Sequence, residues 1–331
     1  MTRRQGIAAL VFIAVVWGCC FPLIKQTLSQ ASPLLFLAIR FLLASVFVLP
    51  WLRGLTRHEL LGGLVLAVLF WAGFVFQTVG LAHTTPSRSA FITGLSTPLV
   101  PVAYFLLYRR TPSVATALAV LVTGVGMYLL TRPSGTGGGI NVGDLLTLGC
   151  AVMFAFQIVA AGHFTPTARP ERLLALQLTA TGLLSALAAP VFETPRLVLT
   201  SGVALAIAFL SVTATVTFYL QLGAQRVVSP ALTAIIFTLE ALAAAVTSWI
   251  VVGETLTLVQ WAGGLLILVG ALLPFVGAAG WPAPASYGSP KIESGPWRPT
   301  HPSASRWERA DLRGSAGGDP GGVGQGPEER H

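Results

Sequence analysis

A single carboxylate, Glu240, lies near the middle of an apolar stretch that runs from residue 229 to residue 252. A helix needs about 20 apolar residues to cross a bilayer, so this stretch places Glu240 near the middle of the hydrocarbon layer. An ionisable side chain at that depth costs roughly 2.5–3.5 kcal/mol on insertion scales, and such residues commonly serve function. We therefore expect Glu240 to contact a substrate or carry protons. A structural carboxylate hydrogen-bonded to a facing helix is the alternative.

Arg40 is a second charged residue inside an apolar stretch, seven residues from the start of residues 33–52. At 1.5 Å per residue, this places it ~10 Å below one membrane surface. From there its long side chain could extend to the surface, or it could hold a substrate carboxylate or Glu240. The sequence leaves these alternatives open.

Residues 211–221 alternate hydroxyl and apolar side chains in the way of a β-strand. An unpaired strand cannot cross lipid, so a helix is expected, with Thr217 and Gln221 on one stripe and Tyr219 on the next, all on one broad side. A cavity lining is the hypothesis here, and contact between helices is the alternative. The residues predicted to line a substrate cavity are Glu240, Arg40, Trp17, Gln77, Ser96, Gln157, Thr217, Tyr219 and Gln221.

The composition identifies the class of protein that must position these residues. Of 331 residues, 54% are hydrophobic and 10% are charged, whereas a soluble domain carries about 25% charged residues. The fold class expected is therefore an all-α polytopic membrane protein. Ten apolar stretches are long enough to be transmembrane helices: residues 7–24, 33–52, 60–81, 87–108, 114–131, 142–161, 173–192, 203–222, 229–252 and 257–279.

Basic residues in the connections predict the orientation. Nine of them fall on one side of the membrane, and four, Lys25, Arg88, Arg132 and Arg196, fall on the other. Because Lys and Arg are enriched in cytoplasmic loops, both the N-terminus and the C-terminus are expected in the cytoplasm. The nine cytoplasmic residues are Arg3, Arg4, Arg53, Arg57, Arg109, Arg110, Arg169, Arg172 and Arg226.

The chain divides into two halves of five stretches each, residues 1–131 and 142–280, joined by a Gly-rich linker at residues 132–141. A shift of 144 residues brings the halves into register, for example Gly126 onto Gly270 and Ser96 onto Glu240. Since each half has an odd number of spans, the halves must be inverted relative to each other, which places substrate sites between them near the midplane. Residues 281–331 are rich in Gly and Pro, and we expect a disordered cytoplasmic tail.

The net charge of +8 does not indicate nucleic-acid binding. In residues 281–331, six basic residues balance six acidic ones, so the whole excess lies in the short connections between apolar stretches, where it reports orientation. The three cysteines form neither a disulfide framework nor a zinc-binding spacing. We predict no enzymatic activity, no cofactor and no metal.

Five short motifs occur in chain order along the apolar stretches. They are Trp17-Gly18-Cys19-Cys20-Phe21, Arg40-Phe41-Leu42-Leu43-Ala44, Thr93-Gly94-Leu95, Gly253-Glu254-Thr255-Leu256-Thr257 and Gln260-Trp261-Ala262-Gly263. In this order, over residues 7–279, the chain resembles EamA-type transporters of the drug/metabolite transporter superfamily. The resemblance implies two inverted five-helix repeats and transport of small metabolites, commonly amino acids and often outward.

The chain departs from the pattern of that family at three places. Cys19 and Cys20 stand where the family usually has a Ser or Thr together with an Asn. Ala241 stands where a proline usually follows the glutamate, here Glu240, and Arg109-Arg110 stands where a Gly-Glu pair is common. These differences bear on the identity of the substrate more than on the fold.

The sequence thus predicts a multi-pass secondary transporter of the cytoplasmic membrane. We expect it to bind a small metabolite, such as an amino acid, in a midplane cavity and to export it by alternating access. A proton-coupled drug or amine efflux transporter is one alternative, and a non-transporting membrane scaffold or receptor is another. The expected partners are a small-molecule substrate and the lipid bilayer, with protons in the coupled version. The sequence leaves open whether the protein forms a homodimer.

Overall fold

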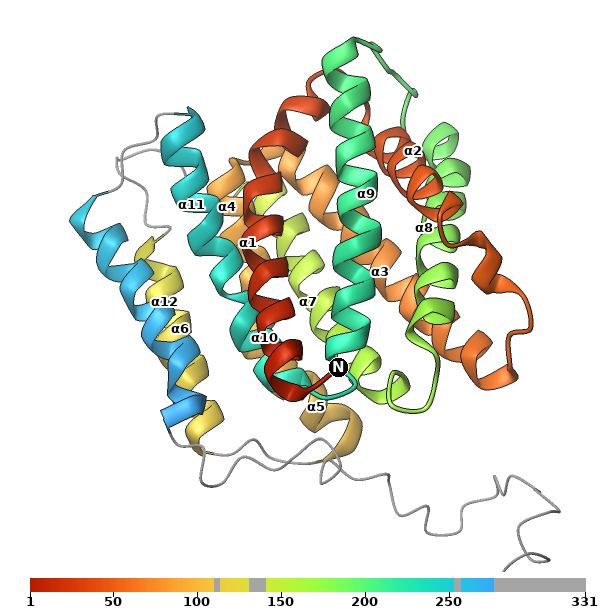
Figure 1. Ribbon diagram of the computed structural model, residues 1–331. Coiled ribbons are helices and arrows are strands. Elements are labelled where there is room, and N and C mark those ends of the chain that lie inside the picture. Colours follow the sequence, from red (N-terminus) through yellow and green to blue (C-terminus); the bar gives the residue numbers. More distant parts are fainter. Residues whose placement is uncertain (110–113, 131–140, 253–256, 277–331) are drawn as a thin grey trace, which may run out of the picture. The chain divides into compact units, whose positions relative to one another are not determined.

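The computed structural model describes residues 1–109, 114–130, 141–252 and 257–276, and its regular elements there are helical apart from one β-bridge, Ala31 with Leu197 (Figure 1). Most of the predicted linker and the whole predicted tail lie outside these residues. The elements are α1 (Arg3–Leu28), α2 (Pro33–Val46), the 3₁₀ helix η1 (Leu49–Leu52), α3 (Arg57–His83), α4 (Pro86–Gly94), α5 (Ser96–Tyr108), α6 (Val114–Leu130), α7 (Val142–Phe164), α8 (Pro170–Phe192), α9 (Ser201–Ala224), α10 (Pro230–Phe237), α11 (Leu239–Val252) and α12 (Leu258–Val276).

These helices suit a bilayer in length and composition. In the described part of the chain, seven are long and apolar enough to cross a membrane, if α4 with α5 and α10 with α11 each count as one. Three shorter apolar helices, at Pro33–Val46, Ala117–Leu129 and Leu258–Gly270, fall within the other three predicted spans. Large apolar side chains such as Leu187, 70% accessible, and Phe12, 52% accessible, cover the surface. A lipid-facing surface accounts for this pattern, which supports the predicted polytopic all-α class.

Three predicted spans differ from the observed helices. The span at 33–52 is shorter, because α2 ends at Val46 and Pro50 lies in the separate η1 helix. The spans at 87–108 and 229–252 are both interrupted, at Leu95 and at Thr238. At each interruption the backbone switches to hydrogen bonds three residues apart, Leu95 to Ile92 and Thr238 to Ile235, which tighten the helix locally.

The 144-residue shift takes Leu95 to Leu239, so the two interruptions fall within one residue of equivalent places. Helices α4 and α10 both begin with proline, Pro86 and Pro230, after a hydroxyl N-cap, Thr85 or Ser229, and both end within nine residues. A proline is tolerated at a helix start because its missing N–H would be unpaired there anyway. The halves therefore share local helix signals as well as apolar periodicity.

Long-range packing places α1 and α3 at the centre of the bundle. Helix α1 packs against α9 and α11, and α3 packs against α7 and α8 along its length. Helices α6 and α12 lie side by side at the left edge of Figure 1. Their crossing requires two glycines, since a Cβ on Gly126 would meet the Gly263 carbonyl at 2.7 Å, and one on Gly270 would meet the Thr123 nitrogen at 2.9 Å.

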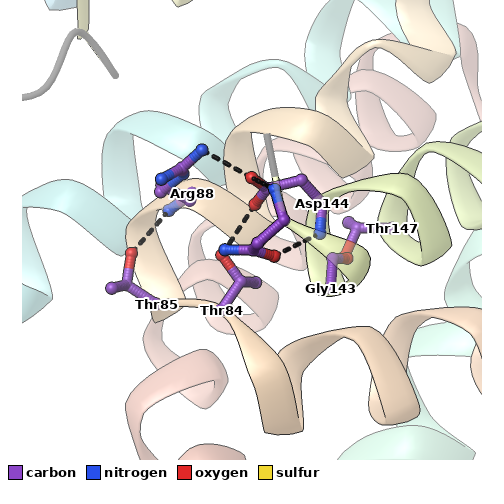
Figure 2. Close-up of polar contacts among 7 residues, drawn as sticks. Thr84, Thr85, Arg88, Gly143, Asp144 and Thr147 are labelled. Carbon is purple, nitrogen blue, oxygen red and sulfur yellow. Dashed lines mark hydrogen bonds and ion pairs between the residues drawn. The ribbon is translucent and has the colours of Figure 1, made fainter. Parts of the chain in front are cut away.

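Ion pairs join the two halves of the chain at both ends of the bundle. At one end, here named the Glu59 end, Nη1 of Arg172 lies 2.7 Å from Oε2 of Glu59, and Glu59 also caps the start of α3. The opposite end, the Asp144 end, is shown in Figure 2: Asp144 accepts hydrogen bonds from Arg88, from the Thr84 hydroxyl at 2.8 Å, and from the backbone N–H of Asn141 at 3.1 Å. These contacts fix α4 and α7 relative to α3.

We predict that Asp144→Asn lowers stability more than Arg88→Gln does. Asp144 is buried and faces three donors, so an amide NH2 in its place leaves donors unpaired at a cost of about 1–3 kcal/mol. The Arg88 side chain is 29% accessible, and loss of such a partly exposed pair costs about 1 kcal/mol or less. Thermal unfolding of the purified protein measures both. Equal losses would contradict this ranking.

Candidate functional site

A cavity of about 60 Å³ lies between helices of both halves. A buried water needs roughly 10–15 Å³ of such space, so the cavity has room for only a few water molecules. A metabolite therefore requires that side chains or helices of its wall move apart. Seven of the nine predicted site residues line it: Trp17, Arg40, Gln77, Ser96, Gln157, Gln221 and Glu240.

Aromatic rings form most of the remaining wall. Phe70, Phe74 and Phe218 contact one another with ring centroids 4.5–5.8 Å apart. Phe154 adds a further edge contact to Phe74 at 5.3 Å. Such edge-to-face packing holds the rings in fixed orientations, so the cavity has a defined apolar wall as well as a few polar groups.

Glu240 lies in the first turn of α11, directly after the interruption at Thr238. It is 8% accessible, and its carboxylate has no hydrogen bond or ion pair with any residue that the structure describes. The structural alternative required a bond to a facing helix, and the described residues provide none.

The backbone of α1 lies directly against Glu240. A Cβ on Gly18 would meet the Glu240 carbonyl oxygen at 2.5 Å, the Ala243 side chain at 2.6 Å and the Ala244 nitrogen at 2.8 Å. Only a glycine allows this approach. Gly18 therefore determines how close the wall helix carrying Trp17 comes to the helix carrying the carboxylate.

Arg40 is buried, at 3% accessible, so the alternative in which it extends to the membrane surface is wrong. Its guanidinium lies 5.2–6.0 Å from the ring centroids of Phe36, Phe41 and Phe74. Nε donates to the backbone carbonyl of Leu210 at 3.4 Å, whereas Nη1 is buried without a hydrogen-bond partner. Aromatic faces stabilise the cation in place of a counter-ion, and among the described residues it forms no ion pair with Glu240.

Two predicted site residues lie outside the cavity wall. Thr217 lies behind it and accepts a hydrogen bond from Nε1 of Trp17 at 2.9 Å, which orients that ring. Tyr219 is 45% accessible and stacks on Trp51 with centroids 6.0 Å apart. The prediction that Tyr219 and Gln221 share one side of the helix is wrong, because two residues correspond to a turn of about 200°.

Polar groups on two other walls complete the site. Gln77 donates to the hydroxyl of Thr93 at 3.3 Å, and both side chains line the cavity. Gln221 donates to Gln157 at 3.3 Å, and behind them lies Gln225, which the sequence did not indicate because it follows the last apolar residue of its stretch. Ser96, in the first turn of α5, lines the cavity at the position equivalent to Glu240.

Comparison with known proteins places these features in a family. The sequence model of the EamA-like transporter family matches the chain twice, over residues 4–132 and 141–276. The chain belongs to the EamA-like transporter family. It is therefore a multi-pass membrane protein that transports a small molecule, and the earlier resemblance is confirmed.

Named relatives agree with this assignment. An uncharacterised transporter of Archaeoglobus fulgidus is 34% identical over 272 residues, which cover 82% of this chain and 86% of the relative. The uncharacterised inner membrane transporter YicL of Salmonella typhimurium is 27% identical, covering 82% of this chain and 95% of the relative. One solved crystal structure aligns with a TM-score of 0.67 at 18% identity, over 82% of this chain and 98% of that chain, which shows a shared fold.

We predict that Gly18→Val separates α1 from α11 and destabilises the protein. The added side chain meets backbone atoms that cannot rotate away, and overpacking of this kind costs about 1–3 kcal/mol. Gly124→Val is the matched control, since a Cβ on Gly124 meets nothing within 4 Å while the change in helix propensity is the same. Thermal unfolding should show a clearly larger loss for Gly18→Val. Similar losses in both variants would show that close contact with α11 is unimportant.

Proposed function

We propose that the protein is a secondary transporter of the cytoplasmic membrane that works by alternating access. The observation that carries this proposal is Glu240, a buried carboxylate with no partner among the described residues, in a cavity lined by helices of both halves. Ionisable groups inside a membrane usually mark a pathway for substrates or protons. The paired helix interruptions at Leu95 and Thr238 support it further, since transporters commonly form midplane sites at broken helices.

In the proposed topology, ten spans form two inverted five-span halves, residues 1–131 and 142–280. The Glu59 end then faces the cytoplasm together with both termini, as the distribution of arginines favours. The Asp144 end faces outward. Rocking of the halves about the cavity would expose Glu240 to each side in turn.

The cargo that suits this cavity is an amino acid or a related amphipathic metabolite. Glu240 provides an acceptor for an ammonium group, and Arg40, with Nη1 unpartnered, provides a donor for a carboxylate. The aromatic wall suits an apolar side chain. Export as the direction of transport rests on the family resemblance alone.

A proton-coupled efflux transporter for amines or drugs is the second candidate. The same buried carboxylate supports it, because a carboxyl group that must lose its proton before it binds a cation couples the two fluxes. The aromatic cavity wall is compatible with either cargo. Membership in a transporter family argues against the scaffold or receptor alternative.

We predict that Glu240→Gln reduces the flux of cargo by about tenfold or more without lowering expression. The reason is that loss of a charge-assisted hydrogen bond costs about 1.5–3 kcal/mol. The measurement is uptake of radiolabelled amino acids into liposomes that contain the purified protein. Glu171→Gln is the control, since Glu171 lies in the first turn of α8 and outside the cavity. Wild-type liposomes that move none of a broad amino-acid panel would overturn the proposed cargo.

An imposed pH gradient separates the two candidates. If Glu240 carries protons, a gradient drives accumulation in wild-type liposomes, and Glu240→Gln abolishes this response. The measurement is initial uptake with and without the gradient. Initial uptake that is the same with and without the gradient would exclude the proton-coupled version.

A further inference from the structure

Four buried glutamine side chains form a hydrogen-bonded row whose two middle members line the cavity. Gln225 donates through Nε2 to the backbone carbonyl of Ile158 at 2.9 Å. Gln221 donates to Oε1 of Gln225 at 3.2 Å and to Oε1 of Gln157 at 3.3 Å. Gln157 in turn donates to Oε1 of Gln177 at 3.4 Å. Gln157 and Gln221 line the cavity, whereas Gln177 and Gln225 do not.

The backbone carbonyl of Ile158 determines the orientation of the row. A carbonyl only accepts hydrogen bonds, so Gln225 must turn its NH2 group toward Ile158 and its oxygen toward Gln221. Gln221 must therefore offer an N–H to Gln225. Its second N–H is given to Gln157. The Ile158 carbonyl thus determines the amide orientation of both Gln225 and Gln221.

One atom of Gln221 is left without a partner as a result. The NH2 group has given both of its hydrogens, and Oε1 is buried with no hydrogen bond. The whole side chain is 1% accessible. A buried, unpaired acceptor is unfavourable, and native proteins contain few of them. A donor from a bound molecule in the adjoining cavity would satisfy it.

We infer that Gln221 is a cargo-specificity residue whose Oε1 accepts a hydrogen bond from a hydroxyl or N–H group of the cargo, and that Gln225 is the positioning residue that holds it as an acceptor. This inference rests on the proposed function and narrows the cargo to metabolites with a donor group beyond the ammonium and carboxylate. For an amino acid, that donor belongs to the side chain.

The chemistry explains why a second residue outside the cavity is required. An amide can rotate to present either its oxygen or its NH2 group to the cavity. Without Gln225, nothing in the described row would keep Oε1 of Gln221, rather than its NH2 group, available to the cargo. A site built to bond a donor discriminates against the analogue that lacks it, because the analogue leaves the acceptor unpaired. One such bond changes affinity by about tenfold.

The test uses near-isosteric amino-acid pairs that differ by one hydroxyl, threonine with valine and tyrosine with phenylalanine. Their half-saturating concentrations for inhibiting labelled amino-acid uptake are measured with the full-length protein in liposomes. In the wild type, the hydroxyl-bearing member of at least one pair should bind about tenfold more tightly. In Gln225→Met and in Gln221→Met, this ratio should fall toward one.

Gln177→Met is the matched control. It removes a buried amide from the other end of the same row, but Gln177 only accepts from Gln157, so the orientation of Gln221 and the selectivity ratio should be retained. A general loss of packing would lower affinity for both members of a pair and leave their ratio unchanged, which separates positioning from stability.

Each other outcome is decisive. If the wild type binds the amino acids but does not distinguish the members of either pair, the inference is wrong while the proposed function stands, and this result needs no variant to fold. If the wild type discriminates and Gln225→Met discriminates equally, Gln225 has no positioning role. If none of the four amino acids binds, the proposed amino-acid cargo fails, and this inference fails with it.

Discussion

The cost of a carboxylate in an apolar bundle is the constraint on which the arrangement of this protein depends. Glu240 has no partner in the described structure, so its burial is not repaid by an ion pair. The interruption at Thr238 places it in the first turn of α11, at the wall of the cavity. Helix α1 approaches so closely at Gly18 that no larger side chain fits there against the backbone of Glu240. A bound cation or a proton would lower the remaining cost of burying the Glu240 carboxylate.

Arg40 is stabilised in a different way, and the difference matters for the cavity. Three phenylalanine rings and one backbone carbonyl surround its guanidinium, so the protein retains a buried positive charge without neutralising it through a carboxylate. If Arg40 and Glu240 paired directly, each would satisfy the other and the cavity would have no unmet charge. Keeping them unpaired leaves one site for an anion and one for a cation within the same space.

The sequence was sufficient wherever a single helix determines the outcome. Apolar length predicts the helices, and the cost of burial alone singles out Glu240 and Arg40. It was insufficient wherever the outcome depends on rotation about a helix axis or on a second helix. Tyr219 was misplaced because alternation along a stretch was treated as one side of a helix, and Gln225 was missed because its role comes from a carbonyl on α7. The interruptions at Leu95 and Thr238 also depend on local hydrogen bonding that apolar periodicity does not report.

The two halves share a backbone plan and differ in chemistry at the place where this matters most. The family model matches both halves, and the interruptions place Ser96 and Glu240 in equivalent first turns, both lining the cavity. If the carboxylate were needed to form the interruption, the first half would require one as well, yet a serine is sufficient there. The interruption therefore does not depend on a carboxylate at this position. In the proposed function Glu240 then contacts the cargo, and the asymmetry gives the cavity one wall with a carboxylate and an equivalent wall with a hydroxyl.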